Sequence, residues 1–201
     1  MSQWRRRVAD VAELVSWAAG LKEPTLGPSR LVCVDGRAGS GKSSLGAAIH
    51  EAASEVCSCA LVHLDDLLDG WEGLDRVSET LERDVLTPIS QGRPGRYRRY
   101  DWHLARFAEE CVVEPVDLLV VEGVGSGASS YMSWITTLVW VDAPAELRTS
   151  RGITRDGEEL RPQWVRWMAA EDALFARERT RDRADVIVDG TGEADQAVVL
   201  T

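Results

Sequence analysis

A single lysine stands between glycines and serines in the segment 36–43, which reads GRAGSGKS and matches the pattern G-x-x-x-x-G-K-[ST]. Glycines let the backbone curl so that successive N–H groups point at phosphate oxygens, and a following helix adds its positive end. We expect Lys42 to bridge the β- and γ-phosphates of a nucleoside triphosphate and Ser43 to bind Mg²⁺. The predicted nucleotide-binding residues are Gly36, Arg37, Ala38, Gly39, Ser40, Gly41, Lys42, Ser43 and Ser44.

Carboxylates at two other places fit the chemistry that a bound triphosphate needs. Asp65 and Asp66 follow the apolar run ALVHL, and Glu122 follows LLVV. Phosphoryl transfer to a hydroxyl requires a carboxylate that accepts the proton and orients the nucleophile, and we expect Asp65 in this role. Asp66 stays open as the base, and helix capping is the alternative for the pair. Glu122 is the predicted Mg²⁺ ligand together with Ser43.

Three arginines, Arg148, Arg151 and Arg155, follow the fourth apolar run at spacings of three and four. These spacings put them on one face of a helix. Arginines on a segment that closes over a triphosphate neutralise the charge that spreads during transfer, so we expect a lid over residues 148–162, with Arg151 and Arg155 as catalytic residues. The charge pattern fits a solvated helix equally well, and the position after a strand favours the lid.

The most basic stretch of the chain, residues 92–107, mixes arginines with aromatic residues. Ring faces and fixed cations suit a small acceptor, so we expect this stretch to form one wall of the acceptor site. The predicted substrate-binding residues are Asp65, Tyr100, Asp101, Trp102 and Arg106. Asp101 is expected to accept hydrogen bonds from acceptor hydroxyls. The alternative is a surface loop in which residues 100–102 form a buried framework.

These candidate residues must be held by regular elements, and the chain alternates apolar runs with helical patterns. The apolar runs predict strands at 30–35, 60–65, 117–123, 137–142 and 184–190. The helical patterns predict helices at 42–56, about 78–91, about 102–111, 143–151 and 162–181. Such alternation predicts a parallel sheet with helices on both faces, and right-handed crossovers put the carboxyl ends of the strands on one edge. Acidic residues and glycines collect at that edge, where α/β sheets bind ligands.

The composition favours one compact domain over residues 1–201, with an amphipathic helix within 1–28, because 44% of the 201 residues are apolar. A net charge of −10 argues against a broad surface for nucleic acid or an anionic membrane. No apolar run approaches the roughly 20 residues that cross a bilayer, and the N-terminal stretch is unlike a secretory signal. The four cysteines show no paired metal spacing. A reduced, cytoplasmic chain is favoured, with redox activity of the CSC motif at 57–59 as the alternative.

Taken in order, the motifs resemble those of the uridine kinase-like family of P-loop kinases, which also contains phosphoribulokinase and bacterial pantothenate kinase. GRAGSGKSS is similar to the family's phosphate loop, and LDDLLDGW to its D-[DS]-F-Y segment. YDW at 100–102 is similar to its acceptor motif, and VVEGV to its second acidic motif. The resemblance runs from about Leu31 to Gly190.

This resemblance implies an α/β fold, namely the P-loop NTPase three-layer sandwich with a five-stranded parallel sheet in the order 2-3-1-4-5 and an arginine-bearing lid. It implies an ATP-dependent, Mg²⁺-using kinase that transfers the γ-phosphoryl group to a hydroxyl of a nucleoside-like acceptor, with Asp65 as the base. The chain departs from the family at Leu67 and Leu68, where the family usually has phenylalanine and tyrosine. A non-nucleoside acceptor such as pantothenate, a sugar phosphate or glycerate therefore stays open.

Two other functions compete with a kinase, namely an NTP-hydrolysing regulatory module and a nucleotide-binding protein without catalysis. The chain has lysine only at positions 22 and 42, so it lacks the N-K-x-D motif by which GTPases recognise guanine. The joint presence of Asp65, Glu122 and the lid arginines argues against a loss of catalysis. The sequence leaves the oligomeric state open, with a homo-oligomer as one option.

Overall fold

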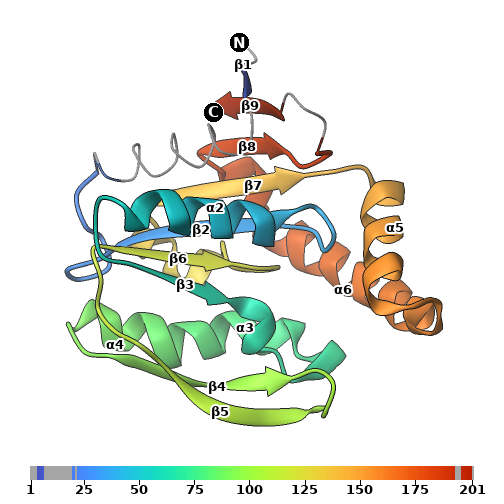
Figure 1. The fold of residues 1–201 in the computed structure, drawn as a ribbon, viewed down its shortest axis with the longest axis horizontal. Coiled ribbons are helices and arrows are strands. Elements are labelled where there is room, and N and C mark those ends of the chain that lie inside the picture. Colours follow the sequence, from blue (N-terminus) through green and yellow to red (C-terminus); the bar gives the residue numbers. More distant parts are fainter. Residues whose placement is uncertain (1–3, 7–19, 21, 193–195, 201) are drawn as a thin grey trace.

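The computed structural model describes residues 4–6, 20, 22–192 and 196–200 (Figure 1). Five parallel strands form the centre of its main sheet, in the order β3-β6-β2-β7-β8. The strands are β2 (Arg30–Gly36), β3 (Cys59–His63), β6 (Leu118–Glu122), β7 (Thr137–Asp142) and β8 (Val186–Asp189). Numbered along the chain, this is the predicted order 2-3-1-4-5, so the predicted P-loop sheet is confirmed.

Helices cover both faces of this sheet, which explains why its strands are apolar on both sides. On one face lies α2, whose Leu45 and Ile49 share an apolar cluster with Val34 of β2 and Val120 of β6. The elements on the other face contribute to a second, larger cluster. The helices that form the two outer layers are α2 (Lys42–Ser54), α3 (Leu74–Leu81), the π-helical stretch η3 (Glu82–Leu86), α4 (Thr87–Ser90) and α6 (Arg161–Glu178).

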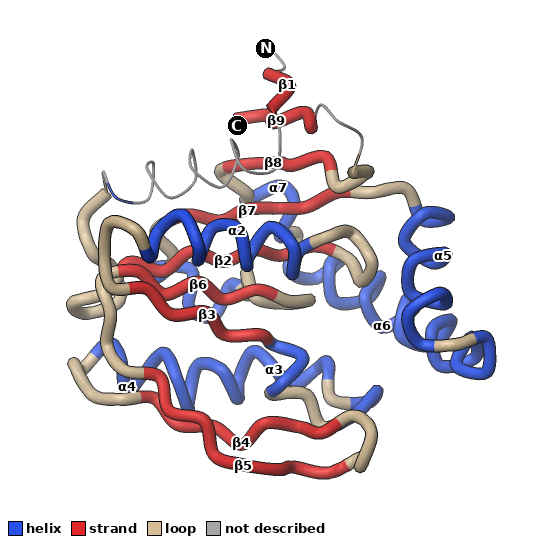
Figure 2. Tube along the Cα trace, in the orientation of Figure 1, coloured by secondary structure: helices blue, strands red, loops and turns tan. Residues whose placement is uncertain are grey.

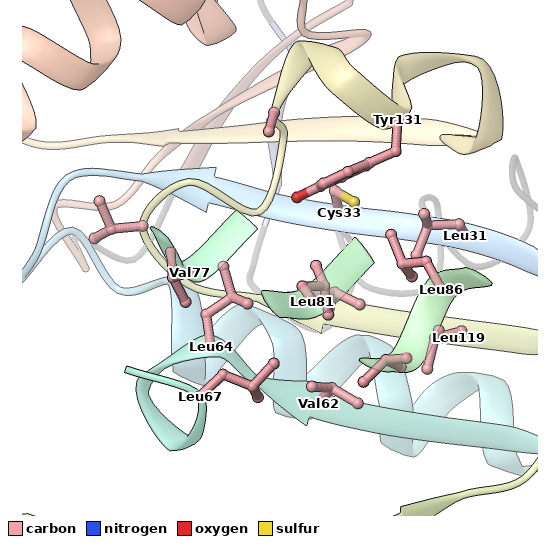
Figure 3. Packing of buried hydrophobic residues seen from close by; sticks show 14 of the residues in the cluster. Leu31, Cys33, Val62, Leu64, Leu67, Val77, Leu81, Leu86, Leu119 and Tyr131 are labelled. Carbon is pink, nitrogen blue, oxygen red and sulfur yellow. The ribbon is translucent and has the colours of Figure 1, made fainter. Parts of the chain in front are cut away.

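The larger cluster fixes the segment that carries the paired aspartates (Figure 3). Leu119 of β6 meets Leu81 and other apolar side chains of the α3–η3 stretch in this cluster. Leu64 and Leu67, which flank the two aspartates, are both buried in it. The short 3₁₀ turn η1 (Leu64–Asp66) is therefore anchored on both sides, and its carboxylates are held at the edge of the sheet.

Two short strands extend the sheet beyond β8, and the sequence does not predict either of them. β9 (Gln196–Leu200) pairs antiparallel with β8, and β1 (Trp4–Arg6) pairs antiparallel with β9. Most of the predicted N-terminal helix, including residues 7–19, lies outside the described residues. Among the described residues of that segment, the prediction is wrong at residues 4–6, which form a strand, and at Leu26, which forms a β-bridge to Ser29, whereas Gly20 is helical.

The predicted helix at about 102–111 is also wrong. The structure has an antiparallel hairpin there, formed by β4 (Gly95–Asp101) and β5 (Arg106–Val113). Figure 2 shows this hairpin beside the α3–α4 helical layer and apart from the main sheet. In β4 the buried Tyr97 lies between two exposed arginines, a period of two that is typical of a strand. A register shift between Arg98 and Tyr100 turns Tyr100 inward as well.

The predicted lid segment corresponds to most of α5 (Ala145–Asp156), the 3₁₀ turn η5 (Glu158–Leu160) and the first residues of α6. In Figure 1, α5 lies beyond the carboxyl ends of the strands, on the side where α2 begins. The remaining short helices are η2 (Gly70–Glu72), η4 (Ser129–Trp134) and α7 (Thr180–Arg183). Among the helices that the structure describes, none is long and apolar enough to cross a membrane.

Candidate active site

The predicted phosphate loop joins β2 to α2, as the sequence pattern requires. Gly41 precedes α2 in a left-handed conformation, and no side chain caps the first turn of the helix. The first N–H groups of α2 therefore keep their capacity to bind an anion. Gly39 has a φ of 77°, and a Cβ at this position would approach the carbonyl oxygen of Arg148 to 2.4 Å. Only glycine fits there, because the loop lies directly against α5.

Lys42 supplies the cation of this loop. Its side chain is largely buried, and its Nζ donates to the carbonyl oxygen of Arg37 at 3.0 Å. Within the part of the chain that the structure describes, no carboxylate pairs with this ammonium group. A cation without a direct carboxylate partner, beside an uncapped helix start, fits phosphate groups, so the loop fits the triphosphate that the sequence predicts.

Asp65 lies at the centre of the charged groups that surround the loop. Its side chain reaches solvent but is densely surrounded by protein atoms, and the resulting desolvation raises its pKa above the usual range. The positive charges of Lys42 and Arg155 oppose this shift. The largest charge effects on Asp66 come from His63 and Arg99, followed by Asp65 and Glu122. Of the two aspartates, Asp65 is therefore the one on which Lys42 is the strongest neighbouring charge.

Glu122 and His63 form a pair that the sequence analysis missed. Glu122 is buried at the end of β6, and its Oε1 lies 2.6 Å from Nδ1 of the half-exposed His63 at the end of β3. The hydrogen bond to Glu122 raises the pKa of His63 above its usual value, although partial burial opposes it. A Cβ on Gly46 of α2 would come within 3.0 Å of the Glu122 side chain, so the carboxylate lies against the helix that begins with Lys42.

Glu122 and Ser43 are the residues present that fit Mg²⁺, because a carboxylate and a hydroxyl are both oxygen ligands. The described residues contain no cluster of three or more side chains of the types that hold a metal by themselves. That agrees with the usual P-loop site, in which phosphate oxygens and water complete the shell. The signal that would have found His63 is its place two residues before Asp65, at the end of a buried strand.

Asp35, a carboxylate to which the sequence analysis gave no role, ties the loops of the site together. Asp35, fully buried at the end of β2, accepts hydrogen bonds from the backbone N–H groups of Gly36, Gly125 and Gly127 at 2.7, 2.9 and 2.9 Å. Burial raises the pKa of Asp35 to about 6, although these three donors and the charge of Lys42 oppose the shift. Asp35 therefore fixes the glycine-rich loop after Glu122 against the start of the phosphate loop.

All three predicted lid arginines are directed at the site from α5. Arg148 is buried and donates to the carbonyl oxygens of Ala143 at 3.1 Å and Ala38 at 3.4 Å. Arg151 donates to the carbonyl oxygens of Gly39, Gly190 and Thr191 at 3.2, 2.7 and 2.6 Å, and so links the phosphate loop to the turn after β8.

Arg155 is placed differently from the other two arginines. Its guanidinium pairs with Asp156 at 2.6 and 3.0 Å, and its charge acts on Asp65. The guanidinium groups of Arg148 and Arg151 donate hydrogen bonds to backbone carbonyls. Of the three arginines, Arg155 is the one whose charge acts most strongly on Asp65. Arg155 is therefore the lid arginine best placed to act in transfer.

The predicted acceptor residues lie on the hairpin, at its end nearest Asp65. Trp102 is 38% exposed, and its indole N–H donates to the backbone carbonyl of Asp65 at 3.1 Å. Tyr100 is buried and packs edge-to-face on Trp102 and Phe107. Trp102 therefore places this end of the hairpin beside Asp65.

Asp101 and Arg106 are less directly connected to Asp65. One oxygen of Asp101, Oδ1, accepts the backbone N–H groups of His103 and Leu104 at 3.0 and 2.9 Å and so holds the turn of the hairpin. These two bonds lower the pKa of Asp101. Arg106 pairs through its backbone with Asp101 and is exposed. The structure thus gives Asp101 a framework contact, and its other oxygen accepts no hydrogen bond from the described residues.

An aromatic cluster continues from Trp102 to α6. The ring of Trp71 lies 5.6 Å from that of Trp102, 6.4 Å from that of Trp164 and 5.8 Å from that of Trp167, each in an edge-to-face arrangement. A separate cavity of about 310 Å³ lies between the α3–η3 stretch and the hairpin. Tyr97 and Phe107 line that cavity, whereas none of the residues from Tyr100 to Arg106 does.

Comparison with known proteins finds the same architecture in solved structures. A possible uridine kinase from Bacillus stearothermophilus superimposes with a TM-score of 0.67 and 19% identity over 89% of this chain and 97% of that one. A protein proposed to be a fructose transport system kinase, from Silicibacter sp. TM1040, gives 0.56 and 18% over 89% and 95%. The YGR205w protein gives 0.53 and 11% over 98% and 100%.

No family model matches the chain, and no curated protein matches its sequence. At the identities of the structural matches, the likeness concerns the fold. It agrees with the strand order and with the loop between β2 and α2. The chain is therefore a P-loop α/β protein with the architecture of these solved structures.

Proposed function

We propose that this protein is an ATP-dependent small-molecule kinase that transfers the γ-phosphoryl group to a hydroxyl of a nucleoside-like acceptor. The observation that carries the proposal is the placement of Asp65, on whose charge Lys42 acts more strongly than any other neighbouring charge. A carboxylate opposite the cation of a phosphate loop is the arrangement that phosphoryl transfer to an alcohol needs. The fold shared with a possible uridine kinase supports it.

In the proposed mechanism, the N–H groups of the phosphate loop and the ammonium of Lys42 hold the phosphates in line with the acceptor. Asp65 accepts the proton of the acceptor hydroxyl and orients its oxygen. Ser43 and Glu122 would hold Mg²⁺, which supplies charge neutralisation at the phosphates when it is bound. His63 fixes the orientation of Glu122 through their hydrogen bond. Arg155 stabilises the charge that spreads over the transferred group.

We place the acceptor between Asp65 and the exposed part of the Trp102 ring. Tyr100 packs edge-to-face against this ring and holds it in place. Aromatic faces bind planar rings, which favours a nucleoside-like acceptor. A cytoplasmic location is part of the proposal, because all four cysteines are free thiols.

A screen of ATP consumption over nucleosides, pantothenate, sugar phosphates and glycerate tests the proposal. We expect one class of alcohol, nucleosides first, to raise ATP consumption well above the rate with water alone. The Lys42→Ala variant is the blank for contaminating kinases. A rate that no acceptor changes would favour an NTP-hydrolysing module instead.

We predict that Arg155→Met moves the acid limb of the pH profile to higher pH. Asp65 acts as a base only when it is ionised, and desolvation by the surrounding protein atoms already raises its pKa. Arg155 opposes that rise, so removing its charge makes ionisation still less favourable and raises the pKa further. The measurement is kcat/KM for the acceptor between about pH 5 and pH 8.

Arg161→Met is the matched control, because Arg161 is an exposed arginine of the same segment that pairs with Glu158. We expect its profile to coincide with that of the wild type. A limb that stays in place in Arg155→Met, or that moves to lower pH, would show that Arg155 does not act on the base.

We predict that Trp102→Ala raises the acceptor KM about tenfold, the scale expected for losing one stacked ring, and leaves the KM for ATP nearly unchanged.

Asp101→Asn distinguishes acceptor binding by Asp101 from its role in holding the hairpin turn, because an amide oxygen still accepts the N–H groups of His103 and Leu104. We expect this variant to raise the acceptor KM as well. If its kinetics equal those of the wild type, Asp101 only holds the hairpin turn.

A further inference from the structure

One residue of the phosphate loop, Ala38, is held at both its N–H and its C=O by side chains from outside the loop. The N–H of Ala38 donates to Oε1 of Glu171 at 2.6 Å, and Glu171 belongs to α6. The carbonyl oxygen of Ala38 accepts from Nη1 of Arg148 at 3.4 Å, and Arg148 belongs to α5. The two side chains lie 3.7 Å apart, Nη1 to Oε2.

Glu171 is an unusual residue to find in this place. Its side chain is completely buried, and a buried carboxylate is unfavourable unless other groups compensate it. Burial raises the pKa of Glu171. Four groups oppose this rise, namely the N–H of Ala38, the charge of Lys42, the indole N–H of Trp167 and the charge of Arg148. Its Oε1 takes both hydrogen bonds, from Ala38 and from Trp167 at 2.9 Å, whereas Oε2 accepts none. Oε1 is therefore the atom through which Glu171 contacts the phosphate loop.

The neighbours of Ala38 show why its orientation matters. Gly39 follows it directly and lies so close to α5 that no side chain fits there. Lys42 donates to the carbonyl oxygen of Arg37, the residue before Ala38. The peptide group between Arg37 and Ala38 is thus held at its C=O by Lys42 and at its N–H by Glu171, and rotating it would redirect the N–H groups of the loop that follow.

We propose that Glu171 is a positioning residue for the phosphates of the nucleotide. It acts through the backbone, by holding the Ala38 N–H so that the later N–H groups of the loop converge on one anion. The inference rests on the proposed function, because it requires that the loop binds a nucleoside triphosphate. The sequence pattern of the loop contains no hint of it, since Glu171 lies more than a hundred residues away in the chain.

Two variants separate the reach of the Glu171 side chain from its charge. Glu171→Gln keeps an acceptor oxygen at the same distance, and its amide NH₂ takes the place of Oε2, which accepts no hydrogen bond but lies 3.7 Å from Nη1 of Arg148. Glu171→Asp keeps the charge but withdraws the oxygen by one methylene, about 1 Å or more. Asp182→Asn is the control, because Asp182 lies on α7, outside the phosphate loop, and its exposed ion pair with Arg179 contributes little.

The measurement is the affinity of each protein for ATP and for adenosine, which lacks phosphates, by titration calorimetry or competition. We expect Glu171→Asp to weaken ATP binding about tenfold to 10²-fold, the range expected for a displacement of this size, with adenosine binding unchanged. We expect Glu171→Gln and Asp182→Asn to keep the wild-type ratio of the two affinities within about threefold.

A wild-type ratio in Glu171→Asp would overturn the inference, as would a loss in Glu171→Gln equal to or greater than that in Glu171→Asp, because the charge would then matter instead of the hydrogen bond. A thermal melt checks folding, and if Glu171→Asp does not fold, the ratio in Glu171→Gln decides alone. If the wild-type chain binds adenosine and ATP equally, the proposed function itself fails, and the inference fails with it.

Discussion

Lys42→Ala is expected to reduce phosphoryl transfer by about 10²–10³-fold or more and to weaken ATP binding, because it removes the cation fixed at the β- and γ-phosphates. Lys42 begins α2, is largely buried and has only a backbone carbonyl as its hydrogen-bond partner among the described residues. No other ammonium group is near enough to replace it, since the only other lysine, Lys22, bonds to the carbonyl oxygen of Thr136.

The chain thus provides its own control for this prediction. Lys22→Ala removes the same charge from a site that interacts with Thr136 and Asp185, away from the phosphate loop. We expect Lys22→Ala to retain wild-type kcat and KM for ATP. Transfer at the wild-type rate in Lys42→Ala, measured with the same acceptor, would contradict the assignment of the loop.

Asp65→Asn is expected to lower kcat by roughly 10²–10⁴-fold, the usual contribution of a general base, with the affinity for ATP nearly intact. An asparagine keeps the size of the side chain but cannot accept the proton of the acceptor hydroxyl. The measurement is single-turnover transfer together with the equilibrium affinity for ATP.

Asp66→Asn is the matched control, since Asp66 is the adjacent residue and its charge interacts with His63 and Arg99. We expect at most a small change in this variant. If Asp66→Asn is the slow variant and Asp65→Asn is not, the base is Asp66 and the proposed geometry of the acceptor must be moved by one residue.

The sheet could be predicted from the sequence because burial on both faces leaves a strong local signal. Runs such as LVCV at 31–34 and LLVV at 118–121 are apolar without interruption, as strands between two helical layers must be. The phosphate loop could be predicted equally well, since its glycines and lysine lie close together in the chain. The parallel order then brought Asp65 and Glu122 to the same edge as Lys42.

The hairpin shows where sequence reasoning failed and why. Residues 102–111 read WHLARFAEEC, in which leucine, alanine and glutamate are good helix formers, whereas tyrosine alternates with arginine in the strand before them. The alternation extends over a few residues only, and a register shift between Arg98 and Tyr100 interrupts it. A reading based on helix propensity therefore predicted a helix, whereas the packing of Tyr97 and Tyr100 favours strands.

The groups that support the site could not be predicted, because their partners lie far away in the chain. His63 meets Glu122 across 59 residues, and Glu171 meets Ala38 across 133. Asp35 reaches Gly127 across 92 residues, and only the fold shows that it joins two loops. The sequence thus predicts the residues whose neighbours are local, and the structure adds those that position them.

The most direct test of the central claim is the fate of label from γ-labelled ATP in the presence of the best acceptor from the screen. Transfer to a hydroxyl predicts that nearly all the label appears as a phosphate ester of the acceptor and that Asp65→Asn abolishes this product. Release of the label as inorganic phosphate, at a rate that neither the acceptor nor Asp65→Asn changes, would contradict the account.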